Sequence, residues 1–188
     1  MSFNIGIIIA SIREGRKGQV VAEWVAQEAQ KRNLEGINYT ILDLKEYDLP
    51  MLGKVLSNEE LERVNSWKND MNAMDAYIIV TPEYNHGAPG SLVNAFQYLK
   101  PEVANKSLGF VGYGFVGATR AIVNFRTQLV YQQLAIVQQQ INLNLNLDFS
   151  TKDNTSVFEP KDYHLPEVDN LLNQLITWGK ALKTTRSK

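Results

Sequence analysis

Short apolar runs alternate along the chain with longer stretches in which apolar residues recur every three to four positions. The short runs are typical of buried or half-buried strands and predict strands at 3–10, 37–44, 76–81, 107–113 and 136–145. The amphipathic stretches predict helices at 18–33, 58–73, 90–100, 118–135 and 168–183. Residues 45–57 are predicted to form a loop, and the polar residues 150–164 an irregular one.

Local signals mark two of the helix ends. Ser57 or Asn58 is the expected N-cap of the helix at 58–73, with Glu60 close behind it. Pro101 is expected to stop the helix at 90–100, because proline cannot continue the helical hydrogen-bond pattern.

Strands and helices that alternate in this way predict βαβ units on a parallel sheet, and therefore an α/β three-layer sandwich. The strands at 3–10, 76–81 and 107–113 are almost continuously apolar, which suits burial on both faces. We expect five parallel strands in the order 2-1-3-4-5. In that order the topology reverses beside the first and third strands, so a ligand crevice is expected at their carboxyl ends.

Composition narrows the function classes. The 188 residues suit one domain over 1–188, and the net charge of −1 gives no global field for nucleic acid or anionic membrane. Cysteine is absent, which removes disulfides, thiolate nucleophiles and cysteine-ligated metals. The N-terminus lacks a basic segment and is interpreted as a strand rather than a signal peptide, and no apolar run is long enough to cross a membrane. A cytoplasmic protein is expected.

The loop after the first strand, "SIREGRKG", is rich in groups that bind anions. Ser11 offers a hydroxyl, Arg13 and Arg16 offer forked donors, and Gly15 and Gly18 let the backbone approach a ligand. The loop leads into a helix N-terminus, whose free N–H groups favour an anion. A solvated connector would also carry surface arginines, but the position at the expected crevice favours a phosphate site.

The loop after the third strand, "TPEYNHGAPG", is stiffened by two prolines and two glycines. Tyr84 supplies a flat amphipathic face, and the Asn85 side chain can both donate and accept hydrogen bonds. Such a loop suits a planar, hydrogen-bonding ring. The alternative is a simple helix-entry turn, which explains Pro89 and Gly90 but leaves the "PEYN" stretch unexplained.

The loop after the fourth strand, "GYGFVG" at 112–117, matches the glycine pattern of dinucleotide-binding proteins. A true match requires an acidic residue about 20 positions later for the ribose, and residues 128–142 contain none. We therefore interpret these glycines as a close-approach loop lining the same crevice. Arg120 is equally consistent with reaching back into the crevice and with a helix surface.

The two histidines, His86 and His164, lie 78 positions apart and show no zinc-binding spacing, so no metal site is predicted. His86 lies in the loop after the third strand, where it is a surface turn residue or a contact for a substrate. His164 is interpreted as a loop residue. Trp24, Trp67 and Trp178 occupy helix positions and are expected in the core or an interface rather than on a nucleic-acid surface.

Taken together, "SIRxxR" after the first strand, "TPEYN…PGxLxNA" after the third and "GYGxxGxxRA" after the fourth resemble the NADPH-dependent FMN reductase family, which includes flavin, quinone, azo-dye and chromate reductases. The resemblance spans about residues 1–135 and implies a flavodoxin-like fold. Two positions and one stretch depart from the family pattern: Ala10 replaces a glycine, Val93 replaces a lysine, and "FQYL" replaces a helix ending with an acidic residue and tryptophan.

The resemblance also implies a cofactor, its ligands and a reaction. FMN would be bound non-covalently, with NADPH or NADH as co-substrate, in a homodimer or tetramer that reduces a small-molecule acceptor by ping-pong exchange. The 5′-phosphate would be held by Ser11, Arg13, Arg16, Gly18 and Gln19. The isoalloxazine ring would be lined by Pro82, Glu83, Tyr84, Asn85, Gly112, Tyr113 and Gly114.

Two other classes fit the same pocket. A flavodoxin-type electron carrier would shuttle electrons without oxidising nicotinamide, but such carriers tend to be strongly acidic with a hydroxyl-rich phosphate loop. A flavin-binding sensor module without turnover is compatible with every motif above.

Overall fold

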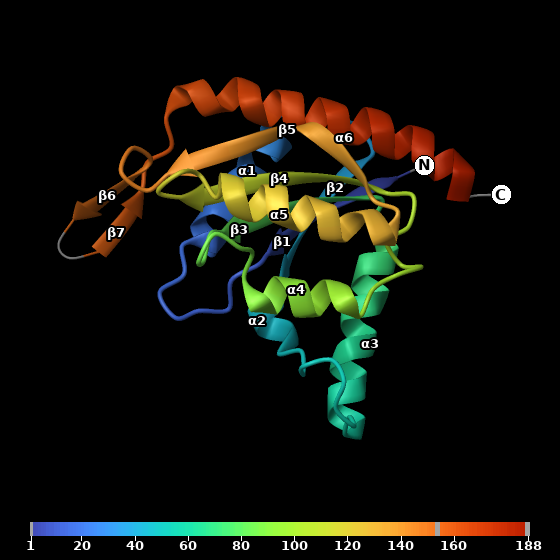
Figure 1. Ribbon diagram of the computed structural model, residues 1–188. Helices are drawn as coiled ribbons and strands as arrows, with labels where there is room; N and C mark the ends of the chain where they lie inside the picture. Colours follow the sequence, from blue (N-terminus) through green and yellow to red (C-terminus); the bar gives the residue numbers. More distant parts are fainter. Residues whose placement is uncertain (1, 153–154, 187–188) are drawn as a thin grey trace.

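The computed structural model describes residues 2–152 and 155–186 and contains a central five-stranded sheet between two layers of helices (Figure 1). The strands lie in the order β2-β1-β3-β4-β5, and every pair is parallel, as predicted. Their bounds are β1 Phe3–Ile9, β2 Ile37–Asp43, β3 Ala76–Pro82, β4 Ser107–Gly114 and β5 Ala135–Asn144.

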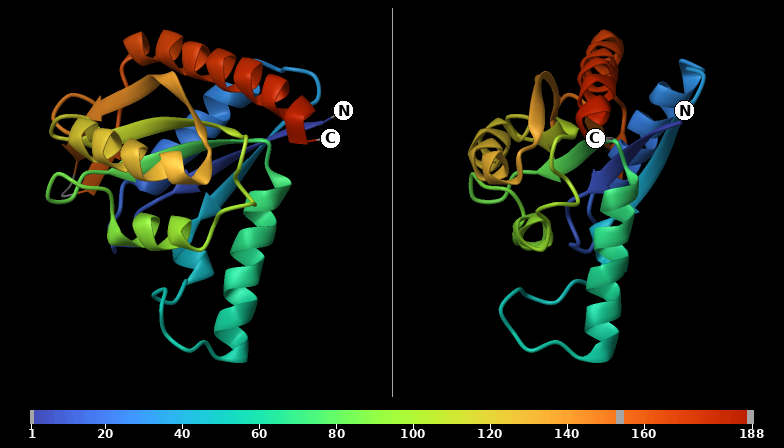
Figure 2. Two further views of the ribbon diagram at one scale, coloured as in Figure 1. Left: turned by 45° about the vertical axis from the view of Figure 1, so that its right-hand side comes forward. Right: turned by 90° about the vertical axis from the view of Figure 1, so that its right-hand side faces the viewer.

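Among the described residues, two α-helices cover one face of the sheet and four lie on the other (Figure 2). The first layer holds α1 (Gly18–Lys31) and α6 (Leu165–Arg186). The second holds α2 (Leu44–Tyr47), α3 (Asn58–Ala73), α4 (Gly90–Gln97) and α5 (Thr119–Leu129). Within the described ranges, no helix is both long and apolar enough to cross a bilayer.

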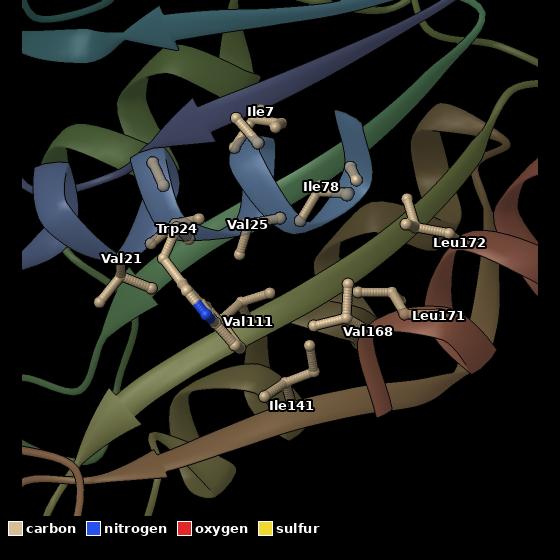
Figure 3. Packing of buried hydrophobic residues seen from close by; sticks show 14 of the residues in the cluster. Ile7, Val21, Trp24, Val25, Ile78, Val111, Ile141, Val168, Leu171 and Leu172 are labelled. Carbon is tan, nitrogen blue, oxygen red and sulfur yellow. The ribbon is translucent and has the colours of Figure 1, made fainter. Parts of the chain in front are cut away.

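Each face of the sheet has its own core, because strands buried on both sides present apolar side chains alternately to the two layers. Under α1 and α6, the side chains of Val25, Ile78, Val111 and Leu171 pack together (Figure 3). On the opposite face the indole of Trp67 is fully buried and donates a hydrogen bond to the Ala95 carbonyl at 2.9 Å.

The N-terminus of α3 follows the sequence prediction. The Ser57 side chain accepts a hydrogen bond from the Glu60 N–H, and the Glu60 carboxylate accepts one from the Ser57 N–H. This reciprocal capping box satisfies two backbone donors that a helix start otherwise leaves free. The last two turns of α3 supply Trp67 and Met71 to the core, while its first turns extend away from the sheet (Figures 1 and 2).

The prediction that 150–164 is irregular was wrong. Strands β6 (Phe149–Lys152) and β7 (Thr155–Phe158) form an antiparallel hairpin, followed by a 3₁₀ turn, η2, at Asp162–His164. Residues 153–154 lie outside the described residues. The rings of Phe149 and Phe158 stand 4.9 Å apart, and Phe158 packs edge-on against Trp24. These apolar contacts between distant residues stabilise the two strands against each other and against α1. A run of four residues in the sequence does not show such contacts.

Several helix bounds also differ from those predicted. The helix α2 lies within the predicted loop at 45–57, and α6 begins at Leu165 rather than 168. The helix α4 ends at Gln97, four residues before Pro101, so the proline does not set its end. The helix α5 ends at Leu129 and passes into the 3₁₀ turn η1 (Val130–Gln132), which Gln133 closes in the left-handed conformation. Trp178 is 52% exposed and lies outside the core, unlike Trp24 and Trp67.

Candidate functional site

A cavity of about 410 Å³ lies at the carboxyl ends of β1, β3 and β4, where three loops meet. This is the edge at which a parallel sheet with a topological reversal binds its ligands. The loops contribute residues 13–17, 82–84 and 113–115, and Arg120 and Leu145 complete the lining. The structure therefore brings together the three loops singled out in the sequence.

The loop 11–17 carries three cations, of which Arg13 and Arg16 differ sharply in their partners. The Arg13 guanidinium is exposed and has no hydrogen-bond or ion-pair partner within the described part of the chain. The Arg16 guanidinium instead forms two hydrogen bonds with the Asp43 carboxylate at the end of β2, one of them from Nη1 at 2.7 Å. Arg16 Nη1 also donates to the Ser11 carbonyl oxygen at 2.9 Å, so this side chain braces the loop.

The first turn of α1 is open to an anion. Lys17 occupies the N-cap position and gives no side-chain cap, and the first turn contains no acidic residue. The backbone N–H groups of Gly18 and Gln19 therefore have no capping side chain, and the helix dipole adds positive potential there. A Cβ on Gly18 would lie 3.0 Å from Ile9 Cγ2 and 3.1 Å from the Tyr113 hydroxyl, so a side chain is disfavoured at this position.

Two predicted side chains are engaged elsewhere. The Gln19 amide donates to the Glu23 carboxylate at 3.0 Å along the exposed face of α1. The Lys17 ammonium donates to the Ser156 hydroxyl of the hairpin and lies 5.2 Å from the centre of the Phe149 ring.

The loop 82–87 turns through two residues in the left-handed conformation. Asn85 (φ 49°) and His86 (φ 64°) are the central pair, and Tyr84 and Gly87 exchange backbone hydrogen bonds of 3.0 and 2.9 Å. Two positive φ angles are typical of a type I′ turn, in which a histidine is strained. Asn124 on α5 donates from Nδ2 to the His86 carbonyl at 3.0 Å and so supports the turn.

Ser11 and Tyr84 link the two loops. The Ser11 hydroxyl lies 2.9 Å from the Tyr84 hydroxyl and accepts a hydrogen bond from the Arg13 N–H at 3.3 Å. The Tyr113 hydroxyl lies close by, and burial, reinforced by Tyr84, raises the pKa of Tyr113 well above its usual range. Tyr113 is therefore a neutral donor at neutral pH.

Glu83 and Arg120 form an ion pair, which answers the open question about Arg120. The Glu83 carboxylate accepts hydrogen bonds from Arg120 Nε at 2.7 Å, and from the backbone N–H groups of Arg120 and Ala121 at 3.1 and 3.3 Å. Burial acts to raise the pKa of Glu83, but these hydrogen bonds and the Arg120 charge outweigh it and lower the pKa. The Glu83 side chain thus caps α5, and Glu83 is also one of the residues that line the cavity.

The glycines of 112–117 are explained by the packing of their own loop. A Cβ on Gly112 would lie 2.3 Å from the Gly117 carbonyl oxygen. Gly117 has a φ of 62°, and a Cβ there would lie 2.5 Å from Asn142 Cβ. The loop therefore folds back against β4 and β5, and the glycine pattern needs no dinucleotide to account for it.

The comparisons agree with this geometry. An NAD(P)H-dependent FMN reductase of Nectria sp is 28% identical over 125 residues, covering 62% of this chain and 62% of that protein. The chain thus spans less than two thirds of that relative's length. An NADPH azoreductase of Bacillus sp. (strain OY1-2) is 27% identical over 141 residues, covering 73% of this chain and 75% of that protein.

Among solved structures, the flavoenzyme NAD(P)H:(acceptor) oxidoreductase FerB from Paracoccus denitrificans superimposes with a TM-score of 0.71 at 17% identity. The superposition covers 93% of this chain and 98% of FerB and shows a shared fold. The sequence profile of the NADPH-dependent FMN reductases matches residues 3–147, which include all three loops of the cavity. The chain belongs to the NADPH-dependent FMN reductase family.

Proposed function

We propose that the chain is an NAD(P)H-dependent oxidoreductase that holds FMN non-covalently in the cavity at the carboxyl ends of β1, β3 and β4. The main support is the lining of the cavity of about 410 Å³. On one side it has Arg13, Arg16 and the start of α1, which has no side-chain cap, and on the other it has loops that carry the aromatic side chains of Tyr84 and Tyr113. A nucleotide with an anionic tail and a planar head has these two chemistries in the same order.

The phosphate end would be held mainly by Arg13 and by the N–H groups of Gly18 and Gln19. Arg13 brings a forked donor that no side chain of the described ranges occupies. Arg16 would contribute from its place beside Asp43, and the Ser11 hydroxyl would hold Arg13 through its backbone. The electrostatic part of this attraction weakens as salt is added.

The ring end would be lined by Pro82, Glu83 and Tyr84 on one side and by Tyr113 and Gly114 on the other, all of which border the cavity. The predicted residues Asn85 and Gly112 adjoin these stretches in the chain but are not among the residues that line the cavity. The ion pair between Glu83 and Arg120 fixes the loop 82–87 against α5. The backbone N–H groups of this loop would therefore be in place before a ligand binds. Fixed donors of this kind stabilise negative charge without reorganisation.

FMN in this site would supply hydride acceptance from a reduced nicotinamide and then reduction of a second acceptor, such as flavin, quinone, an azo dye or chromate, in ping-pong order. The chain supplies binding and orientation. For its assembly we propose a homodimer, or a tetramer built from it, in the cytoplasm. Exposed apolar side chains on the loop before α3, including Met51, Leu52 and Val55, favour a covered surface there.

The test is an anaerobic titration of the FMN-loaded protein with NADPH and with NADH, followed by the visible flavin absorption. We expect the visible flavin absorption to be lost within the mixing time and to return when an acceptor is added. A stable yellow colour would instead support a flavodoxin-type carrier or a sensor module. A protein that neither retains nor rebinds FMN would overturn the proposal.

A panel of flavin, quinones, azo dyes and chromate then separates the acceptor classes. The expected signature is a set of parallel lines in double-reciprocal plots for nicotinamide and acceptor. In ping-pong exchange the oxidised nicotinamide leaves the site before the acceptor binds there. Intersecting lines would contradict that order while leaving the oxidoreductase proposal intact.

A further inference from the structure

His164 is buried between two carboxylates at the base of the β6–β7 hairpin, outside the region matched by the family profile. Its Nε2 lies 3.1 Å from Asp148 Oδ1, and its Nδ1 lies 2.6 Å from Glu167 Oε2. Each ring nitrogen of His164 therefore faces one carboxylate oxygen. The two carboxylates flank opposite sides of the ring, so the three groups do not converge on one point as metal ligands would.

Asp148 joins this histidine to the end of β5. Its side chain is fully buried, and its Oδ2 accepts a hydrogen bond from the Asn144 N–H at 2.7 Å. Its backbone carbonyl accepts one from the Glu159 N–H at 2.8 Å, just beyond β7. Asp148 thus ties the hairpin base to the last residue of β5.

The end of β5 in turn holds the rim of the cavity. Asn144 Nδ2 donates to the Phe115 carbonyl at 2.8 Å, and the Leu145 N–H donates to the Gly114 carbonyl at 3.1 Å. Gly114, Phe115 and Leu145 all line the cavity. The side chains of Phe115 and Val116 are 71% and 47% exposed, so apolar packing does little to fix this rim. At the far end of the rim, Asn142 Nδ2 donates to the Gly117 carbonyl at 2.6 Å. The positions of Gly114 and Phe115 depend on the hydrogen bonds from Leu145 and Asn144.

We propose that His164 and Asp148 are positioning residues for the pocket: through Asn144 they fix the rim at 114–117 in its ligand-ready place. The ligand meant here is the FMN of the proposed function, on which that part of the inference rests. If His164 and Asp148 stabilised only the β6–β7 hairpin, replacing them would leave the position of the rim at 114–117 unchanged.

The first test needs no flavin. Amide hydrogen exchange is measured on the wild-type protein and on His164→Gln and Asp148→Asn, with Leu145 as the reporter because its N–H bonds the rim carbonyl of Gly114. Exchange at Leu145 is expected to be about tenfold faster in both variants, as a local opening equilibrium rises. Unchanged exchange at Leu145, with faster exchange only in the hairpin, would overturn the inference.

The matched control is Asp75→Asn. Asp75 is also a buried carboxylate in an ion-pair cluster, but it precedes β3 at the opposite end of the sheet. This variant is expected to lower the global free energy of unfolding. Local opening at the rim, measured by the exchange rate of the Leu145 amide after allowance for that global change, is expected to stay at its wild-type value. A variant that fails to fold is replaced by Asn144→Ala, which removes the side-chain hydrogen bond to the Phe115 carbonyl and the one that Asn144 Oδ1 accepts from the Asn146 N–H.

The second test measures FMN affinity from the quenching of flavin fluorescence. His164→Gln and Asn144→Ala are each expected to raise the FMN Kd about fivefold, and the double variant is expected to do no worse, because residues acting through one network are not additive. Additive losses would overturn the shared route. If the wild-type protein binds no FMN, the proposed function fails, and the exchange experiment still decides this inference.

Discussion

The two ends of the sheet differ in how far their charged side chains are paired within the chain. At the amino end Asp75 is 7% exposed and accepts hydrogen bonds from the Asn4 N–H at 3.0 Å, Lys183 Nζ at 2.7 Å and Arg186 Nη2 at 2.8 Å. At the carboxyl end Arg13 is exposed and has no partner within the described ranges. The carboxyl end also pairs charges within the chain, Arg16 with Asp43 and Glu83 with Arg120, but it leaves the Arg13 cation available.

Lys106 sharpens the contrast at the amino end. Its Nζ donates to the carbonyls of Met71 and Asn72, both at 2.9 Å, at the end of α3. Burial and the Arg186 charge lower the pKa of Lys106 to about 7, against the opposing effect of Asp75 and Glu102. The third acceptor for Lys106 Nζ is the Tyr77 hydroxyl at 3.1 Å, so each of its three N–H groups has an acceptor. The amino end thus satisfies its buried charged groups within the fold, whereas the carboxyl end leaves the exposed Arg13 guanidinium available to a ligand.

Asp75→Asn is expected to have the largest effect on folding. It leaves Lys183 and Arg186 without their shared carboxylate, which we expect to lower the free energy of unfolding by about 3 kcal/mol. Urea unfolding of the flavin-free protein measures this loss. The FMN Kd should stay at its wild-type value, and a clear rise would mean that the two ends are coupled rather than independent.

Arg16→Ala is expected to act on both properties, because Arg16 braces the loop and faces the cavity. The uncompensated Asp43 should cost about 2 kcal/mol of stability. Urea unfolding and FMN titration are run on the same preparation. Weaker FMN binding with unchanged stability would show that the ion pair with Asp43 does little in the flavin-free protein.

Arg13→Ala is expected to leave stability unchanged and to raise the FMN Kd about tenfold, equivalent to about 1.4 kcal/mol. The effect should shrink as salt is added, since a screened cation contributes less to wild-type binding. Lys31→Ala is the control, because it removes the same charge from the other end of α1. If both variants weaken binding equally, general charge rather than a phosphate contact is responsible.

Glu83→Gln is expected to have the smallest effect, a stability loss of about 1 kcal/mol at neutral pH. The pKa of Glu83 is lowered in the folded protein, so the unfolded chain binds more protons just below the ordinary value of 4.5. The stability that Glu83 contributes is therefore present above pH 4.5 and lost as the pH falls below it. Urea unfolding of both proteins across this range should show their difference narrowing, and a constant difference would contradict the assignment.

Much of the fold could be predicted because local patterns determine it. Continuous apolar runs identify β1, β3 and β4, and Ser57 with Glu60 identifies the start of α3. The alternation of strands with helices predicts the sheet order, and that order predicts where the loops meet. The hairpin at 149–158 could not be found in this way, because four-residue strands become recognisable only when Phe149 and Phe158 pack together.

The sequence by itself determined the five strands of the main sheet, their parallel arrangement and the edge at which three loops gather, since each depends on backbone periodicity and connection length. Only the tertiary structure decided which charge meets which: Arg16 with Asp43, Glu83 with Arg120, and His164 with Asp148. These partners are 27, 37 and 16 positions apart. An ion pair depends on a few ångströms between side-chain tips, which periodicity along the chain does not specify.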